Sequence, residues 1–189
     1  MGTLISEWIS EPDLIPCAAN LDIARIAAER WTEAANGTGN PTDAEFARRL
    51  LEDPARSALL DAIFGNSPFL SQSMSIEFEF VREILEQGPE VAFARVLSEL
   101  AEMRRSQVDL PNIMREMRIA KRRCSLVVGL ADIAGTWSLD QVCGSLSQFA
   151  DFALGIAAAH LLASAAAAGE FALADHHNPE FNSGLIVLG

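Results

Sequence analysis

Half of the basic residues in this acidic chain lie in one short stretch. They are Arg104, Arg105, Arg115, Arg118, Lys121, Arg122 and Arg123. On a helix, Arg115, Arg118 and Arg122 share one face at steps of three and four, where like charges cost roughly 0.2–0.5 kcal/mol per pair. Such a face could contact a nucleotide phosphate or an acidic protein surface. Carboxylates of neighbouring helices are the alternative partners, and we favour them because the chain has an excess of acidic residues.

The histidines are weaker candidates for chemistry. Asp175, His176 and His177 are consecutive, and on regular structure three consecutive side chains cannot all point at one ion. We therefore expect a solvated loop there rather than a metal site. His160 lies within an apolar helical segment and is expected at the core or its boundary, because no partner for it is evident.

The cysteines and the standard motifs add no candidate active site. Cys17, Cys124 and Cys143 show no CxxC or metal-ligand spacing, and we expect Cys124 and Cys143 to be buried thiols on apolar helix faces. Phosphate-binding glycine motifs, GxSxG and HExxH are all absent from the sequence. No catalytic residue, cofactor ligand or metal ligand is predicted within this chain.

Charge and composition limit the partners. The 189 residues include 26 acidic and 14 basic side chains, for a net charge of −12. This balance argues against non-specific nucleic-acid binding and against docking on an anionic membrane. The segment Met1 to Ile9 lacks the basic start of a signal peptide. The long apolar run Phe152 to Ala168 contains His160 and predicts a buried helix of a soluble, cytoplasmic protein rather than a membrane span.

Capping residues, prolines and glycines predict successive helices in the N-terminal part. Asn20 can cap a helix that ends before Gly37, and Thr42 can form a capping box with Glu45. Further helices are expected to begin at Asp53-Pro54, at Ser67-Pro68 and at Pro89. The stretch from Ser75 to Gln87 begins with strand-like alternation but continues with helical spacing, so one helix is predicted throughout.

Two long helices follow. The first runs from Pro111 to about Ile133, and the second is capped by Ser138, has Gln141 at its N3 position and ends near Gly169. The first has an apolar seam at Ile113, Met117, Ala120, Cys124, Val127 and Ala131. The second has one at Leu139, Val142, Leu146, Phe149, Ala153, Ile156 and Ala159 or His160. Steps of four and three on both helices predict antiparallel packing across a turn at Gly135.

The C-terminal residues have a different pattern. Glu170 to Ser183 is polar and irregular, and Gly184 to Gly189 is a short apolar run typical of a buried β-strand. A strand needs a neighbour for its backbone groups, and no other segment offers one. The expected organisation is a helical region over residues 1–183, with a loosely attached part at 1–60, and the first strand of a further domain at 184–189.

Several of these segments, taken in order, resemble one enzyme family. They are Phe64-Gly65-Asn66-Ser67-Pro68-Phe69-Leu70-Ser71, Arg115-Glu116-Met117-Arg118-Ile119-Ala120, Leu146-Ser147-Gln148-Phe149-Ala150-Asp151 and Ser183 to Gly189. Together they resemble motifs of the glutamine synthetase adenylyltransferase family, over about two-thirds of the chain. Before Phe64 only helical content can be compared.

The resemblance implies a cytoplasmic, multifunctional enzyme of nitrogen metabolism with two nucleotidyltransferase halves of the polymerase-β type. This chain resembles the half that removes adenylyl groups from glutamine synthetase. In the family, an Asp-x-Asp pair holds Mg²⁺ over the phosphates of ATP or the adenylyl group, and glutamine synthetase and the PII signalling protein are partners. The terminal strand would lead directly into that motif, which this chain lacks, so an inactive fragment without a cofactor of its own is expected.

The fold class expected is therefore all-α: a multi-helix bundle with two long antiparallel C-terminal helices, ending in one orphan β-strand of a truncated nucleotidyltransferase sheet. The alternative function is a non-catalytic helical module that binds a protein through its basic face or through an exposed apolar stripe. An α-solenoid is a weaker alternative, because no fixed internal period is visible. An unpaired Leu185–Leu188 edge could also drive self-association.

Overall fold

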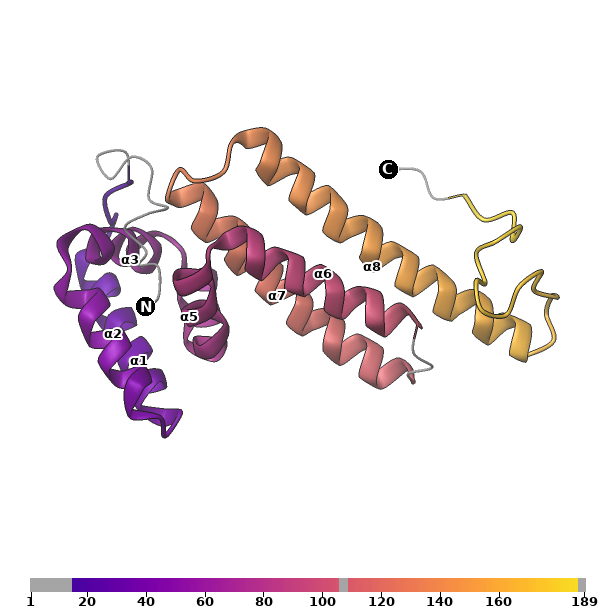
Figure 1. Cartoon of the computed structure of the whole chain (residues 1–189), viewed down its shortest axis with the longest axis horizontal. Coiled ribbons are helices and arrows are strands. Elements are labelled where there is room, and N and C mark those ends of the chain that lie inside the picture. Colours follow the sequence, from indigo (N-terminus) through magenta and orange to yellow (C-terminus); the bar gives the residue numbers. More distant parts are fainter. Residues whose placement is uncertain (1–14, 106–108, 187–189) are drawn as a thin grey trace.

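The computed structural model describes residues 15–105 and 109–186, and its regular structure over these ranges consists of eight helices (Figure 1). The side chains of Ala55 and Arg105 are not described. The predicted all-α class is confirmed over the described residues. The helices are α1 (Leu21–Gly37), α2 (Pro41–Glu52), α3 (Pro54–Asn66), α4 (Pro68–Ile76), α5 (Phe78–Gln87), α6 (Pro89–Arg105), α7 (Leu110–Ile133) and α8 (Leu139–Ala167).

The helices form two groups joined by α5. Helices α1 to α4 lie at one end of the molecule, and α6, α7 and α8 run alongside one another toward the other end (Figure 1). Trp31 of α1 is fully buried, with ring-centroid distances of 6.2 Å to Phe64 and 5.2 Å to Phe78. Burying each such side chain contributes about 1.5–3 kcal/mol. The buried apolar side chains form one continuous core across both groups.

Side-chain caps fix most of the helix starts. Asn20 accepts a hydrogen bond from the amide of Ile23, as predicted for α1. Helix α2 differs from the prediction: Asn40 is the cap and accepts from the Thr42 amide, and Pro41 takes the first helical position. Thr42 is therefore inside the helix. The predicted capping box with Glu45 is wrong, because Asn and Pro together specify an earlier start.

The segment predicted as one helix from Ser75 to Gln87 is interrupted. Helix α4 ends at Ile76, α5 begins at Phe78, and Glu77 stands between them with φ −106° and ψ 40°. Phe78 and Phe80, which follow the break, are both buried. A single straight helix over this stretch is thus a wrong prediction.

The two long helices are confirmed. Helix α8 begins at the predicted cap, Ser138, and the structure adds a capping box in which Ser138 and Gln141 each bond the other's backbone amide. Gly135 makes the turn with φ +68°, a conformation that favours glycine. Trp137, which follows, packs edge-on against Phe93 and donates a 2.8 Å hydrogen bond from Nε1 to Glu90. These contacts hold the α7–α8 turn against the start of α6.

Helix α8 is much more exposed than predicted. Leu139 and Leu146, expected in its buried seam, are 75% and 46% exposed, and Cys143, expected to be buried, is exposed. The described part of the chain contains one helix, α8, long and apolar enough to cross a membrane by length and composition, a criterion that core helices of soluble proteins also meet. Only 11% of its most apolar window is buried. Phe152 to Ala168 was predicted to form a buried helix, and this prediction is wrong for the side of α8 that faces away from α6 and α7.

The C-terminal segment folds back along the bundle as irregular turns (Figure 1). Glu180 pairs with Arg104 of α6, whose guanidinium group crosses α8 at Gly155. From Gly184 to Ile186 the described backbone has no strand, and Leu185 and Ile186 are exposed. The orphan β-strand predicted at 184–189 is thus not confirmed through Ile186, and residues 187–189 lie outside the described range. The domain boundary at 183/184 stays a prediction.

Candidate functional site

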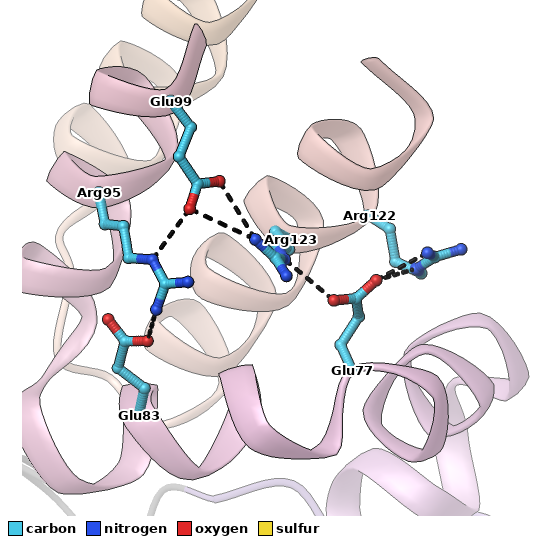
Figure 2. Close-up of polar contacts among 6 residues, drawn as sticks. All are labelled: Glu77, Glu83, Arg95, Glu99, Arg122 and Arg123. Carbon is cyan, nitrogen blue, oxygen red and sulfur yellow. Dashed lines mark hydrogen bonds and ion pairs between the residues drawn. The ribbon is translucent and has the colours of Figure 1, made fainter. Parts of the chain in front are cut away.

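The basic stretch on α7 faces carboxylates of the same chain. Nε of Arg122 donates to Oε1 of Glu77 at 2.8 Å, and Nε of Arg123 donates to Oε2 at 2.9 Å (Figure 2). The Glu77 side chain is only 9% exposed. One nearly buried carboxylate, placed at the break between α4 and α5, therefore neutralises two arginines of α7.

The same network continues across α6. Arg123 also contacts Glu99 at 3.1 Å, Glu99 accepts from Arg95 at 2.9 Å, and Arg95 pairs with Glu83 of α5 (Figure 2). The hydrogen bond to Glu99, together with the charges of Glu83 and Glu99, raises the pKa of Arg95. The guanidinium carbon of Arg123 lies 5.0 Å from the centroid of the Phe80 ring. The six residues drawn in Figure 2 thus join α5, α6 and α7 by charge.

Another arginine makes the same kind of joint between α2 and α5. Arg82 pairs with Glu86 and with Asp43, a carboxylate that is 2% exposed. These hydrogen bonds, that to Glu86 first, raise the pKa of Arg82. The guanidinium carbon also lies 5.4 Å from the centroid of the Phe46 ring. Buried charges of this sort must be paired, so Arg82 and Asp43 act as one structural unit.

The three arginines proposed from sequence as a contact face have different surroundings. Arg122 is held by Glu77, which confirms the favoured alternative of internal pairing at this position. Arg115 is exposed, and its polar partners among the described residues are its neighbours Glu116 and Asn112. Arg118 is exposed and makes no hydrogen bond or ion pair with any described residue. The structure therefore does not bring the three together as one phosphate clamp.

Arg118 lies at an apolar groove between α7 and α8. The groove has a volume of about 340 Å³, and its walls include Met114 and Met117 of α7 and His160 and Leu161 of α8. Met114 and Leu161 are 47% and 65% exposed. An apolar groove beside an unpaired cation suits a protein side-chain contact better than a nucleotide, because it offers few polar groups to fix phosphates.

The three histidines line a second cavity, of about 510 Å³, between α6, α8 and the C-terminal turns. Asp175 caps the turn that follows it by accepting a 2.8 Å hydrogen bond from the His177 amide. Across residues 15–105 and 109–186, no group of three or more histidine, cysteine or acidic side chains is arranged to hold a metal ion. The described residues therefore offer no ligand set for the Mg²⁺ that the sequence resemblance implies for the family.

The Gly65-Asn66-Ser67-Pro68 motif forms a structural joint. The Asn66 side chain accepts from the Ala19 amide at 3.0 Å and donates to the Cys17 carbonyl at 2.9 Å. A Cβ at Gly65 would lie 2.5 Å from the Cβ of Ala18, so only glycine lets this segment pass so closely. Ser67 caps α4 and Pro68 occupies its first turn. The motif thus fastens the segment before α1 to the junction of α3 and α4.

Sequence reasoning missed the partners in these contacts. Glu77 and Glu99 lie 45 and 24 residues from the arginines they bind, and Glu180 lies 76 residues from Arg104. Helical spacing detects only neighbours three or four residues apart. The one available signal was the surplus of carboxylates, which predicted internal pairing without naming the residues.

Comparison with known proteins connects this architecture to a family. The profile of the glutamate-ammonia ligase adenylyltransferase family matches residues 57–189, which include most of α3 and all of α4 to α8. No solved structure matches the chain.

The curated relatives agree with the profile. A bifunctional glutamine synthetase adenylyltransferase/adenylyl-removing enzyme of Rhizobium meliloti is 29% identical over 100% of this chain and 19% of its own length. Its counterparts from Xanthobacter autotrophicus and Brucella suis are 32% and 31% identical over 71% and 69% of this chain, and 13% of their own lengths. The chain spans less than a fifth of these relatives. With most of its length matched, the chain belongs to the glutamate-ammonia ligase adenylyltransferase family.

Proposed function

We propose that these 189 residues form a helical scaffold of the half of the enzyme that removes adenylyl groups from glutamine synthetase, and that they are inactive alone. The observation that carries the proposal is the use of the basic and motif residues as internal joints: Arg122 and Arg123 on Glu77, and Asn66 on the segment before α1. A scaffold needs such joints, whereas an active site needs open polar groups.

The chemistry would come from other parts of a longer polypeptide. Phosphoryl and nucleotidyl transfer depend on metal ions that bridge phosphate oxygens and on carboxylates that hold those ions. No Asp-x-Asp occurs in this sequence. Mg²⁺, ATP or phosphate, glutamine synthetase and the PII signalling protein are accordingly assigned, as part of the proposal, to the longer polypeptide in the cytoplasm.

A chimera tests the proposal. The equivalent region of the Rhizobium meliloti relative, which aligns with the whole of this chain, is replaced by this chain. The chimera is expected to remove adenylyl groups from adenylylated glutamine synthetase, and the 189 residues alone are expected to leave them in place. The matched control is a chimera with Gly65→Leu, which should lose activity with folding. Adenylyl removal by the isolated chain, or a folded chimera without this activity, would contradict the proposal.

A second candidate, a protein-binding surface on α7, is favoured by Arg118, which lies beside the apolar groove and has no polar partner among the described residues. Charge reversal separates the two roles. Arg118→Glu should leave the unfolding free energy within about 0.5 kcal/mol of wild type, because an exposed change away from a network costs little. Arg122→Glu places a like charge against Glu77 and should destabilise the fold. If Arg118→Glu leaves glutamine synthetase binding by the chimera unchanged, this second candidate fails.

A further inference from the structure

The outward face of α8 carries an apolar stripe along most of the helix. Its four leucines are between 46% and 75% exposed, and the smaller side chains among them are exposed as well. The stripe consists of Leu139, Cys143, Leu146, Ala150, Leu154, Ala157 and Leu161. At about 100° per residue, all seven lie within about 40° of the direction of Ala150. In Figure 1, α6 and α7 lie along one side of α8, and the C-terminal segment lies near the C-terminal end of α8.

The stripe has the same pattern in both directions from Ala150. Leu146 and Leu154 lie four residues away on either side, and Leu139 and Leu161 lie eleven away. Between them, Cys143 and Ala157 lie seven away. A symmetric dimer contact requires one patch that is complementary to itself under a two-fold rotation. Two antiparallel copies of α8 centred on Ala150 would stack leucine pairs and small-residue pairs in alternate layers.

Charge favours this face over the rest of the surface. A net charge of −12 makes two copies repel one another, but α8 contains only Asp140 and Asp151 as acidic residues and no lysine or arginine. Asp151 lies next to the centre of the stripe, where it would approach its own copy. Salt screens that repulsion, so association should strengthen as ionic strength rises.

The apolar surface also extends beyond the stripe. Ala157 and Leu161 line the groove between α7 and α8, whose other wall includes Leu110 and Met114. Leu110 is 48% exposed. A stripe of about 33 Å with an adjoining groove offers a continuous contact area, whereas isolated exposed leucines would not.

We propose that α8 binds α8 of a second copy of this chain, antiparallel, with the two-fold axis at Ala150. The contact does not depend on the proposed function. Leucines stand at both four and eleven residues on each side of Ala150, and this symmetry of residue types favours a second copy as the occupant.

A single cysteine on the axis tests the geometry. In a Cys17→Ser, Cys143→Ala background, Ala150→Cys places two thiols against each other across the axis, and mild oxidation is expected to yield a covalent dimer. Gln148→Cys is the matched control, because it is exposed on α8 but points about 160° away from the stripe. Equal cross-linking of the two variants, or none at Ala150→Cys, would overturn the proposal.

Sedimentation equilibrium tests the energetics. The Leu146→Glu, Leu154→Glu variant should keep the helicity and melting temperature of the monomer and weaken the dimer at least about tenfold, or about 1.4 kcal/mol. A chain ending at Asn178 should associate as the full chain does. A wild-type chain that is monomeric in high salt would overturn the proposal, and so would loss of association in the chain that ends at Asn178. A monomeric wild type that floats with neutral phosphatidylcholine vesicles would also overturn it, because the apolar stripe would then bind lipid rather than a second copy.

Discussion

Helices α7 and α8 are neighbours with similar apolar spacing, but the protein uses them differently. Helix α7 contacts α3, α4, α5, α6 and α8, and seven residues between Ala120 and Ala131 are buried. Helix α8 packs mainly on α6 and α7, and only Val142, Ile156 and Ala158 are buried along it. An apolar period therefore shows that a face suits burial, and the surrounding helices decide whether that face is covered.

The largest difference between the two helices should appear when a leucine is shortened. Leu126 of α7 is fully buried, and Leu126→Ala should cost about 2–5 kcal/mol by removing contacts and leaving a cavity. Leu154 of α8 is 50% exposed, and Leu154→Ala should cost less than about 0.5 kcal/mol. Urea unfolding at low protein concentration measures both. Similar losses would contradict the contrast between α7 and α8.

The next effect concerns the charge that holds α7 in place. Glu77→Gln removes the carboxylate shared by Arg122 and Arg123, and should cost about 1.5–3 kcal/mol, the value of hydrogen bonds to a charged group. The control is Glu116→Gln. The Glu116 carboxylate pairs with Arg115 on the surface, so this substitution should lower the free energy of unfolding by less than about 1 kcal/mol. If the two variants unfold alike, the network of Figure 2 contributes no more than a surface ion pair.

A smaller effect is expected at the joint before α4. Gly65→Ala forces a Cβ against Ala18 and should destabilise the fold by about 1–3 kcal/mol. On α8, a Cβ at Gly144 meets nothing within 4 Å, so Gly144→Ala should stabilise the helix by up to about 1 kcal/mol. Thermal unfolding of the two variants should therefore shift in opposite directions. A stabilised Gly65→Ala would show that the segment before α1 is not held closely at this joint.

The smallest effect concerns thiol reactivity. Burial raises the pKa of Cys124 on α7 to about 11, whereas Cys143 on α8 and Cys17 are exposed. At pH 8 the thiols of Cys17 and Cys143 should react rapidly with a disulfide reagent, and the thiol of Cys124 should react only after denaturation. The pKa of the Cys124 thiol is higher in the folded chain than in the unfolded chain. The contribution of this thiol to the free energy of unfolding is therefore fully present below pH 9 and is lost as the pH rises toward 11. Three rapidly reacting thiols in the native chain would show that α7 is not closed around Cys124.

Local signals in the sequence predicted much of the fold. Ser138 and Gln141 identified the start of α8, and the seam from Ala120 to Ala131 identified the buried side of α7. These predictions succeeded because caps and periodicity depend on residues within one or two turns. Thr42 failed as a cap for a local reason, since the better signal of Asn40 and Pro41 lay just before it.

The remaining differences depend on tertiary contacts. The buried side of α8 could not be chosen from sequence, because Leu139 and Leu146 are as apolar as Val142 and Ile156. Glu77, which stands at the break between α4 and α5, binds an arginine 45 residues away, and helical spacing cannot predict such a contact. The candidate site shows the same limit: Arg115, Arg118 and Arg122 share a helical spacing, but within the part of the chain that the structure describes only Arg122 has a distant partner.

The central claim is that other helices of this chain cover the buried residues of α7, whereas the outer face of α8 is exposed. Hydrogen exchange tests this claim most directly. At a concentration where the chain is monomeric, amides of residues 120–131 should exchange only through global unfolding, since that segment is enclosed by other helices. Amides of residues 143–154 in α8 should exchange at least about tenfold faster through local opening. Equal protection of the two segments in the monomer would contradict the claim.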